Sequence, residues 1–98
     1  MSQLVELLAE VLPKDKSSAV TQTYISDALG VSKRTVRQLV QQARHEGICV
    51  CSTPYDGYWL SSKSEDIEET VAILNAHVNT LIDTIADMKK MEAKICGD

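Results

Sequence analysis

The sequence lacks the features that mark membrane proteins and most enzymes. It has no run of about 20 apolar residues, the length that a membrane-spanning helix needs. Its N-terminus has neither the basic start nor the small-residue cleavage site of a signal peptide. It contains no phosphate-binding loop, no paired carboxylates and no recognisable nucleophile beside a base. We therefore expect a cytoplasmic protein that is not an enzyme and makes no membrane contact.

Cysteines are few and are poorly spaced for a metal site. Cys49, Cys51 and Cys96 are odd in number and form no C-x-x-C pair. A zinc site needs about four ligands, and neither His45 nor His77 belongs to a recognisable ligand cluster. We expect reduced thiols, no metal and no cofactor.

The chain as a whole carries a net charge of -4, but its charge is unevenly distributed. Residues 1–63 hold seven Lys or Arg and six Asp or Glu, whereas residues 64–98 hold three and eight. The stretch 32–45 holds four bases and no acid. A local basic stripe of this kind is typical of a surface that binds nucleic acid.

Apolar periodicity and capping residues predict three helices and a hairpin followed by one long helix. In residues 48–61, side chains alternate between two faces and turn residues lie at the centre, which indicates two short strands. The first helix is expected over 4–12, ending at Pro13, and is followed by a loop over 14–19. The second helix is capped by Thr21 and ends at Gly30, and the third, of about 14 residues, is capped by Ser32. Strands over 48–53 and 58–61 are joined by a turn at 54–57, and the last helix, over 64–94, begins with a capping box of Ser62 and Glu65.

This order predicts a mainly α fold with a small β-hairpin. Residues 1–62 are expected to form a winged helix-turn-helix domain and residues 63–98 a long helix. Gly30 permits the sharp turn between the second and third helices, and apolar residues on both fix their crossing.

The outer face of the third helix is polar and free of acids. At 100° per residue, Arg34, Gln38, Gln41 and His45 lie opposite its apolar side. Arginine can pair with the guanine edge and glutamine with the adenine edge, while flanking bases suit phosphates. The residues expected to contact DNA are Ser32, Lys33, Arg34, Arg37, Gln38, Gln41 and Arg44, with Tyr55 at the hairpin tip as a further phosphate donor.

The stretch ISDALGVSKRTVRQLVQQARHEGICV followed by DGYWL resembles the winged helix of biotin-repressor-type and DeoR-like regulators. The resemblance covers residues 20–61, about half the chain. It implies a third helix in the major groove and a hairpin wing at the backbone or minor groove. The wing tip over 53–57 departs from many relatives, since it has no Lys or Arg and one acid.

Alternation along the hairpin assigns its two faces. Ile48 and Val50 should face the core with Tyr58 and Leu60. Cys49, Cys51 and Trp59 should point away from it. Because that outer face is unusually apolar, we expect the long helix, from this chain or from a partner, to cover Trp59.

The long helix carries an apolar seam with heptad spacing. Its residues are Ile67, Val71, Leu74, Val78, Leu81, Ile85 and Met88. β-branched residues at position a and leucine at d favour a parallel two-stranded coiled coil, so we expect a homodimer. Antiparallel pairing stays open, and so does packing of the helix on its own domain.

Two functions from different classes fit these features. The first is sequence-specific binding of double-stranded DNA by a small dimeric transcriptional regulator, of a size that would suit a phage or mobile element. The second is a protein-interaction module that uses the winged helix as a scaffold, which the acidic long helix and the tip without bases would favour.

Overall fold

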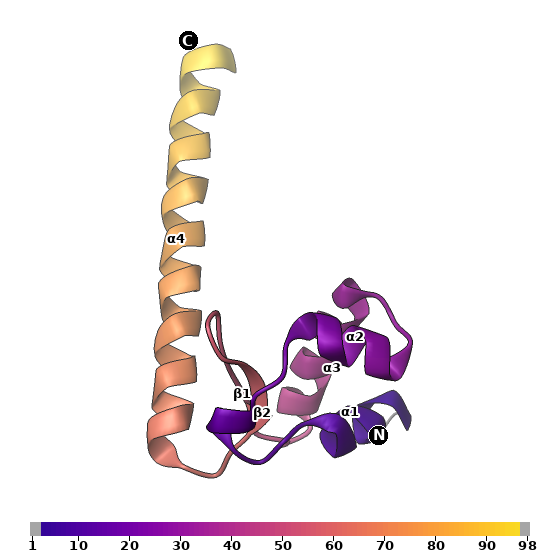
Figure 1. Cartoon of the computed structure of the whole chain (residues 1–98). Coiled ribbons are helices and arrows are strands. Elements are labelled where there is room, and N and C mark those ends of the chain that lie inside the picture. Colours follow the sequence, from indigo (N-terminus) through magenta and orange to yellow (C-terminus); the bar gives the residue numbers. More distant parts are fainter. Residues whose placement is uncertain (1–2, 97–98) are drawn as a thin grey trace.

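The structure is a computed structural model that describes residues 3–96. Residues 1–2 of the expected domain over 1–62 and residues 97–98 of the expected long-helix segment over 63–98 lie outside the described residues. The elements in chain order are α1 (Gln3–Val11), a 3-10 turn (Lys16–Ser18), α2 (Gln22–Leu29), α3 (Lys33–His45), β1 (Val50–Thr53), β2 (Gly57–Leu60) and α4 (Ser64–Cys96). Figure 1 shows α1, α2, α3 and the hairpin gathered at the base of α4, which extends far beyond them. The predicted fold class, a winged helix-turn-helix with a long C-terminal helix, is confirmed.

Short polar side chains fix where α2 and α3 begin. Thr21 accepts a hydrogen bond from the amide of Tyr24, and Ser32 accepts one from the amide of Thr35. Gly30 ends α2 in the left-handed conformation with φ of 68°. These caps confirm the predicted turn, which sets the angle at which α3 crosses α2.

One apolar core joins the three helices to the hairpin. Val36, Val40 and Ala43 form the buried side of α3. Val50 belongs to the same core, and Ile48, Tyr58 and Leu60 pack against it, which confirms the predicted inner face of the hairpin. The whole outer side of α3 is thereby left to solvent.

The hairpin is short, and Val20, which precedes α2, pairs with its second strand. β1 pairs with β2 in antiparallel register from Val50 opposite Leu60 to Thr53 opposite Gly57. Val20 pairs with Tyr58 on the other edge of β2 through two backbone bonds. The predicted start of the first strand at residue 48 was wrong, because the Ile48 amide donates to the Ala43 carbonyl at 2.9 Å and closes the end of α3 instead.

Gly57 is the position where this arrangement tolerates no side chain. Its φ is 102°, and a Cβ placed there would lie 2.8 Å from the Val20 carbonyl carbon and closer still to its oxygen. We expect Gly57→Ala to lower the free energy of unfolding by about 2–4 kcal/mol, from backbone strain and from separation of Val20 from β2. Urea unfolding followed by the fluorescence of Trp59, the single tryptophan, measures this change.

Gly47 offers a matched control, because its φ is 90° and a Cβ there would meet nothing within 4 Å. Gly47→Ala should cost only the strain of a positive φ, about 1–2 kcal/mol. Equal losses in the two variants would contradict the proposed clash with Val20.

The first turns of α4 pack on the outer face of the hairpin. Trp59 is fully buried and its Nε1 donates to Asp66 Oδ2 at 3.2 Å. Thr70, the buried residue of α4, accepts from the amide of Ser52 at 3.2 Å. The prediction that the long helix covers Trp59 is therefore confirmed, and the covering helix belongs to the same chain.

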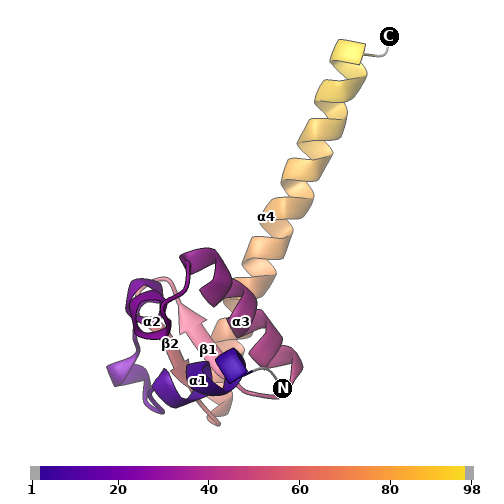
Figure 2. The same ribbon diagram turned by 90° about the vertical axis from the view of Figure 1, so that its right-hand side faces the viewer.

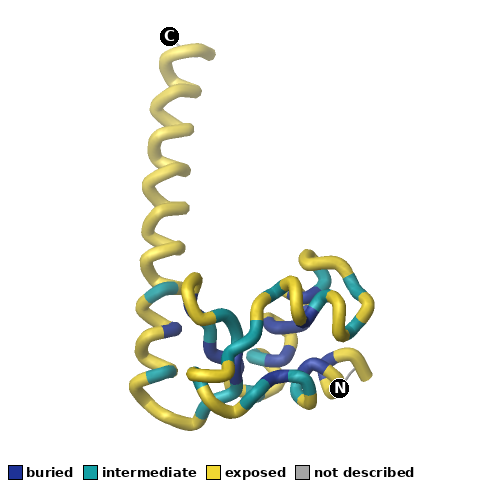
Figure 3. The backbone as a smooth tube through the Cα atoms, in the orientation of Figure 1, coloured by how far each residue is buried: buried dark blue, intermediate teal, exposed yellow. Residues whose placement is uncertain are grey.

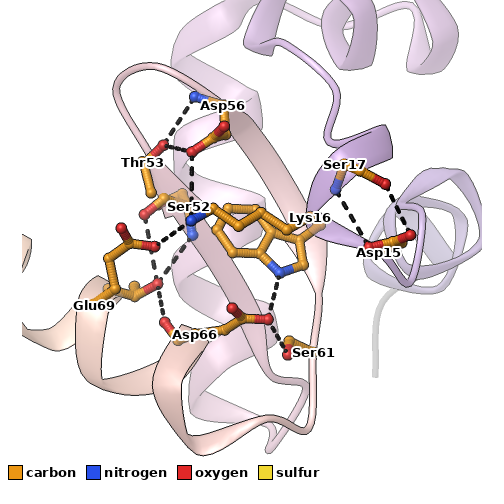
Figure 4. Close-up of polar contacts among 11 residues, drawn as sticks. Asp15, Lys16, Ser17, Ser52, Thr53, Asp56, Ser61, Asp66 and Glu69 are labelled. Atoms are coloured by element: carbon orange, nitrogen blue, oxygen red, sulfur yellow. Dashed lines mark hydrogen bonds and ion pairs between the residues drawn. The ribbon is translucent and has the colours of Figure 1, made fainter.

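The start of α4 is held differently from the sequence prediction. Ser61, rather than Ser62, donates to Asp66 Oδ2 at 2.7 Å (Figure 4). Ser61 Oγ also accepts from the amide of Lys63 at 3.0 Å. The bonds from Ser61 and then Trp59 hold the pKa of the Asp66 carboxyl below its ordinary value. Among residues 3–96 no hydrogen bond joins Ser62 to Glu65, so the expected capping box was wrong. Asp66 instead serves both the helix start and the buried tryptophan.

Beyond its first turns α4 leaves the domain. Every residue from 74 to 96 is exposed, and Figure 3 shows this part of the helix without a buried side. Within residues 3–96 no helix combines the length and the apolar character that crossing a bilayer requires.

Candidate nucleic-acid interface

α3 presents its polar side as an open surface. Arg34, Arg37, Gln38 and Gln41 are exposed, while the apolar residues between them are buried in the core. Figure 2 looks onto α3, which lies on the outside of the domain in front of the base of α4. The structure therefore brings these four predicted DNA contacts onto one accessible face.

The beginning of α3 is fixed to α2. Ser32 uses its hydroxyl as the helix cap, and the Lys33 carbonyl accepts from Gln22 Nε2 at 2.9 Å. The Lys33 side chain remains exposed. Amides in the first turn of a helix have no intrahelical acceptor, so this end of α3 also suits an anion.

Arg44 has a structural task that no sequence pattern indicated. Its Nε donates to the Val50 carbonyl at 2.8 Å, and its Nη2 donates to Ser52 Oγ at 3.1 Å. The side chain is half-buried against β1. Arg44 therefore ties α3 to the hairpin and holds its positive charge in a fixed place.

The wing tip is weakly suited to a nucleic acid. Tyr55 is 97% exposed and offers a phenol to solvent. Asp56 bonds to Thr53 within the turn and lies 3.9 Å from Lys16 Nζ, which also bonds to Glu69 at 2.9 Å. The lysine nearest the tip is thus engaged with acids, as Figure 4 shows.

A concavity lies between α3, the hairpin and α4, and no pattern in the sequence indicated it. Residues from all three elements line it: Arg37, Val40, Gln41, Arg44, His45, Ser52, Tyr58, Leu74 and His77. The place of His77 among these residues depends on the angle at which α4 docks on the hairpin, and no local pattern encodes that angle.

The apolar seam of α4 is exposed along its length. The exposed fraction runs from 38% at Ile67 to 58% at Met88 among the seven predicted seam residues. Ile67, Val71 and Leu74 also line a groove with Cys49 and Cys51 of the hairpin. The seam is therefore continuous with an apolar edge of the domain.

The thiols and histidines do not gather into a ligand set within the described residues. Cys49 Sγ lies 4.0 Å from Cys51 Sγ, and burial raises the pKa of the Cys51 thiol. No group of three or more His, Cys, Asp or Glu side chains placed to hold a metal occurs among residues 3–96.

Comparison with known proteins yields no match: no family model, curated protein or solved structure is similar to this chain at a significant level.

Proposed function

We propose that this protein binds double-stranded DNA in a sequence-specific manner as a homodimer and acts as a small transcriptional regulator. The observation that carries the proposal is the outer side of α3, where Arg34, Arg37, Gln38 and Gln41 are exposed together after a helix-turn-helix turn. A helix of this diameter fits the major groove, and these side chains match the base edges presented there.

The placement of charges on this face of α3 favours a nucleic acid as its partner over a protein. Lys33, Arg37 and Arg44 flank the glutamines, and no acid occurs between Ser32 and His45. Cations at the edges of a helix in the groove lie beside the two phosphate backbones. This arrangement agrees with the resemblance to biotin-repressor-type and DeoR-like winged helices, which remains part of the proposal.

Homodimerisation through α4 is the second part of the proposal. The domain of about 60 residues covers only the first turns of α4, and seven seam residues remain near half exposed. A soluble monomer rarely leaves so long an apolar stripe in water. A second copy aligned in parallel would bury it at a and d positions and present two α3 helices.

Selection of bound sequences from a random duplex pool tests the proposal. We expect a palindromic site whose half-sites lie about 10 base pairs apart or a multiple of that distance. Recovery of no enriched sequence, or of a single half-site without symmetry, would count against a dimeric regulator.

The seam can be broken at one residue. We expect Val78→Glu to raise the Kd for dimerisation by about 100-fold or more, since it places two unpaired carboxylates in an apolar interface. Sedimentation equilibrium measures the change. Asn79→Glu adds the same charge to the neighbouring position outside the seam and should leave the dimer intact; equal effects of both variants would argue against this seam.

An alternative function is a protein-interaction module in which α4 binds a different protein. The exposed seam and the wing tip without bases favour it. A stable complex with an unlike chain through residues 65–95, together with no duplex binding, would decide for this alternative.

A further inference from the structure

The concavity between α3, the hairpin and α4 combines positive and titratable groups from helices that are far apart in the sequence. Arg37, Arg44 and His45 line it from α3, and His77 lines it from α4. Among the described residues that line it, none carries a carboxylate. In a chain with 14 acids and 10 bases, such an acid-free surface is suited to an anion.

We propose that this concavity holds the phosphate backbone of one DNA strand, so that α4 belongs to the DNA interface through His77. The inference rests on the proposed function, because it extends the same interface beyond α3 and the wing.

The geometry of a helix in the major groove places a backbone in this concavity. The groove is about 12 Å wide and a helix with side chains nearly fills it, so phosphates run along both flanks of the helix. One flank of α3 carries Arg37 and Arg44 and faces α4. A backbone following that flank would pass between these arginines and His77.

Arg44 provides a preorganised positive group for an anion in the concavity. The Val50 carbonyl and Ser52 Oγ already hold its guanidinium, so the Arg44 side chain loses little conformational freedom when a phosphate binds. Ser52 also bonds through its amide to Thr70 of α4. The strand β1 thus fixes the arginine and the α4 wall relative to each other.

Histidine makes this part of the interface sensitive to pH, because its charge changes between pH 5 and 8. The charged or titratable groups that line the concavity together with His77 are Arg37, Arg44 and His45 from α3 and Tyr58 from the hairpin. Its neighbours one turn away on α4, at 73, 74, 80 and 81, are uncharged. A phosphate bound beside an imidazole favours the protonated form of that imidazole. Binding then takes up protons, so affinity for DNA increases as pH falls.

Fluorescence anisotropy with a labelled duplex of about 25 base pairs, long enough for two half-sites one helical turn apart, tests the proposal on the full chain at about pH 5.5 and pH 8 over a range of salt concentrations. Wild type should bind more tightly and with a steeper salt dependence at the lower pH. His77→Gln should reduce that gain and lower the slope of log K against log salt by about 0.9 for each phosphate that it no longer neutralises. His77→Lys should bind at the higher pH as tightly as wild type does at the lower one.

Asn79→Lys is the matched control, since residue 79 lies about 200° around α4 from His77 and adds its charge away from α3. Equal gains from His77→Lys and Asn79→Lys would overturn the inference. So would wild-type binding that is independent of pH and unchanged in His77→Gln, with the proposed function intact. Failure of wild type to bind any duplex would overturn the proposed function itself. Weaker dimerisation of His77→Gln in sedimentation, with DNA affinity unchanged, would overturn the inference by placing a second copy in the concavity instead.

Discussion

Replacement of Lys33, Arg34 and Arg37 together by glutamine is expected to abolish duplex binding at physiological salt. Each protomer loses three cations from the exposed side of α3, and a dimer loses six. Each neutralised phosphate contributes about 0.9 to the salt slope, so we expect a loss of affinity on the order of a thousandfold or more. Anisotropy with the selected duplex measures it, and the remaining slope should be shallow.

The loss must come from position rather than from net charge. Glutamine in place of Lys89, Lys90 and Lys94 removes the same number of charges from the far end of α4. That variant should retain most of the affinity. Because all three α3 side chains are exposed, neither variant should change the free energy of unfolding by more than about 0.5 kcal/mol per residue. Unchanged affinity in the α3 variant, or an equal loss in the α4 variant, would end the regulator proposal.

Local signals predicted the elements because each is encoded within a few residues. Thr21 and Ser32 begin their helices as caps, and Gly30 adopts the positive φ that the turn requires. Alternation placed Val50 inward and Trp59 outward, and the structure agrees, since Val50 belongs to the core of the three helices whereas Trp59 bonds to Asp66 of α4. The apolar outer face of the hairpin was enough to predict a cover for Trp59, since a buried tryptophan needs a partner for its area and its N–H.

Long-range contacts could not be predicted in this way. The pairing of Val20 with Tyr58 joins residues 38 positions apart and follows from the path of the chain around β2. Arg44 lies on the basic stripe in sequence, yet its bonds to Val50 and Ser52 depend on how the hairpin folds back on α3. His77 lines the same concavity as residues of α3 only because α4 docks at one particular angle. The predicted basic face was visible in sequence, whereas the wall that α4 adds to it was not.

Trp59→Ala is expected to be the most destabilising single substitution in the domain. The side chain is fully buried between the hairpin and α4, and its Nε1 bonds to Asp66. Lys16 Nζ lies over the ring, 5.8 Å from its centroid. Truncation leaves a cavity and takes one donor from the Asp66 carboxylate, so we expect a loss of about 3–5 kcal/mol. Urea unfolding followed by far-ultraviolet circular dichroism measures it.

Two further variants serve as comparisons for Trp59→Ala. One tests the contribution of the hydrogen bond to Asp66, and the other tests the effect of removing an exposed aromatic residue. Trp59→Phe keeps an aromatic ring and loses the donor to Asp66, so it should cost less than the alanine variant, about 1–3 kcal/mol. Tyr55→Ala removes an aromatic residue that is 97% exposed and should cost about 0.5 kcal/mol or less. Because Trp59 joins α4 to the hairpin, its loss should also free α4 from the domain and expose residues 61–64 to proteolysis. A Trp59→Ala protein as stable and as resistant as Tyr55→Ala would mean that other contacts hold α4 on the hairpin, and the side of the concavity that α4 forms would then not depend on Trp59.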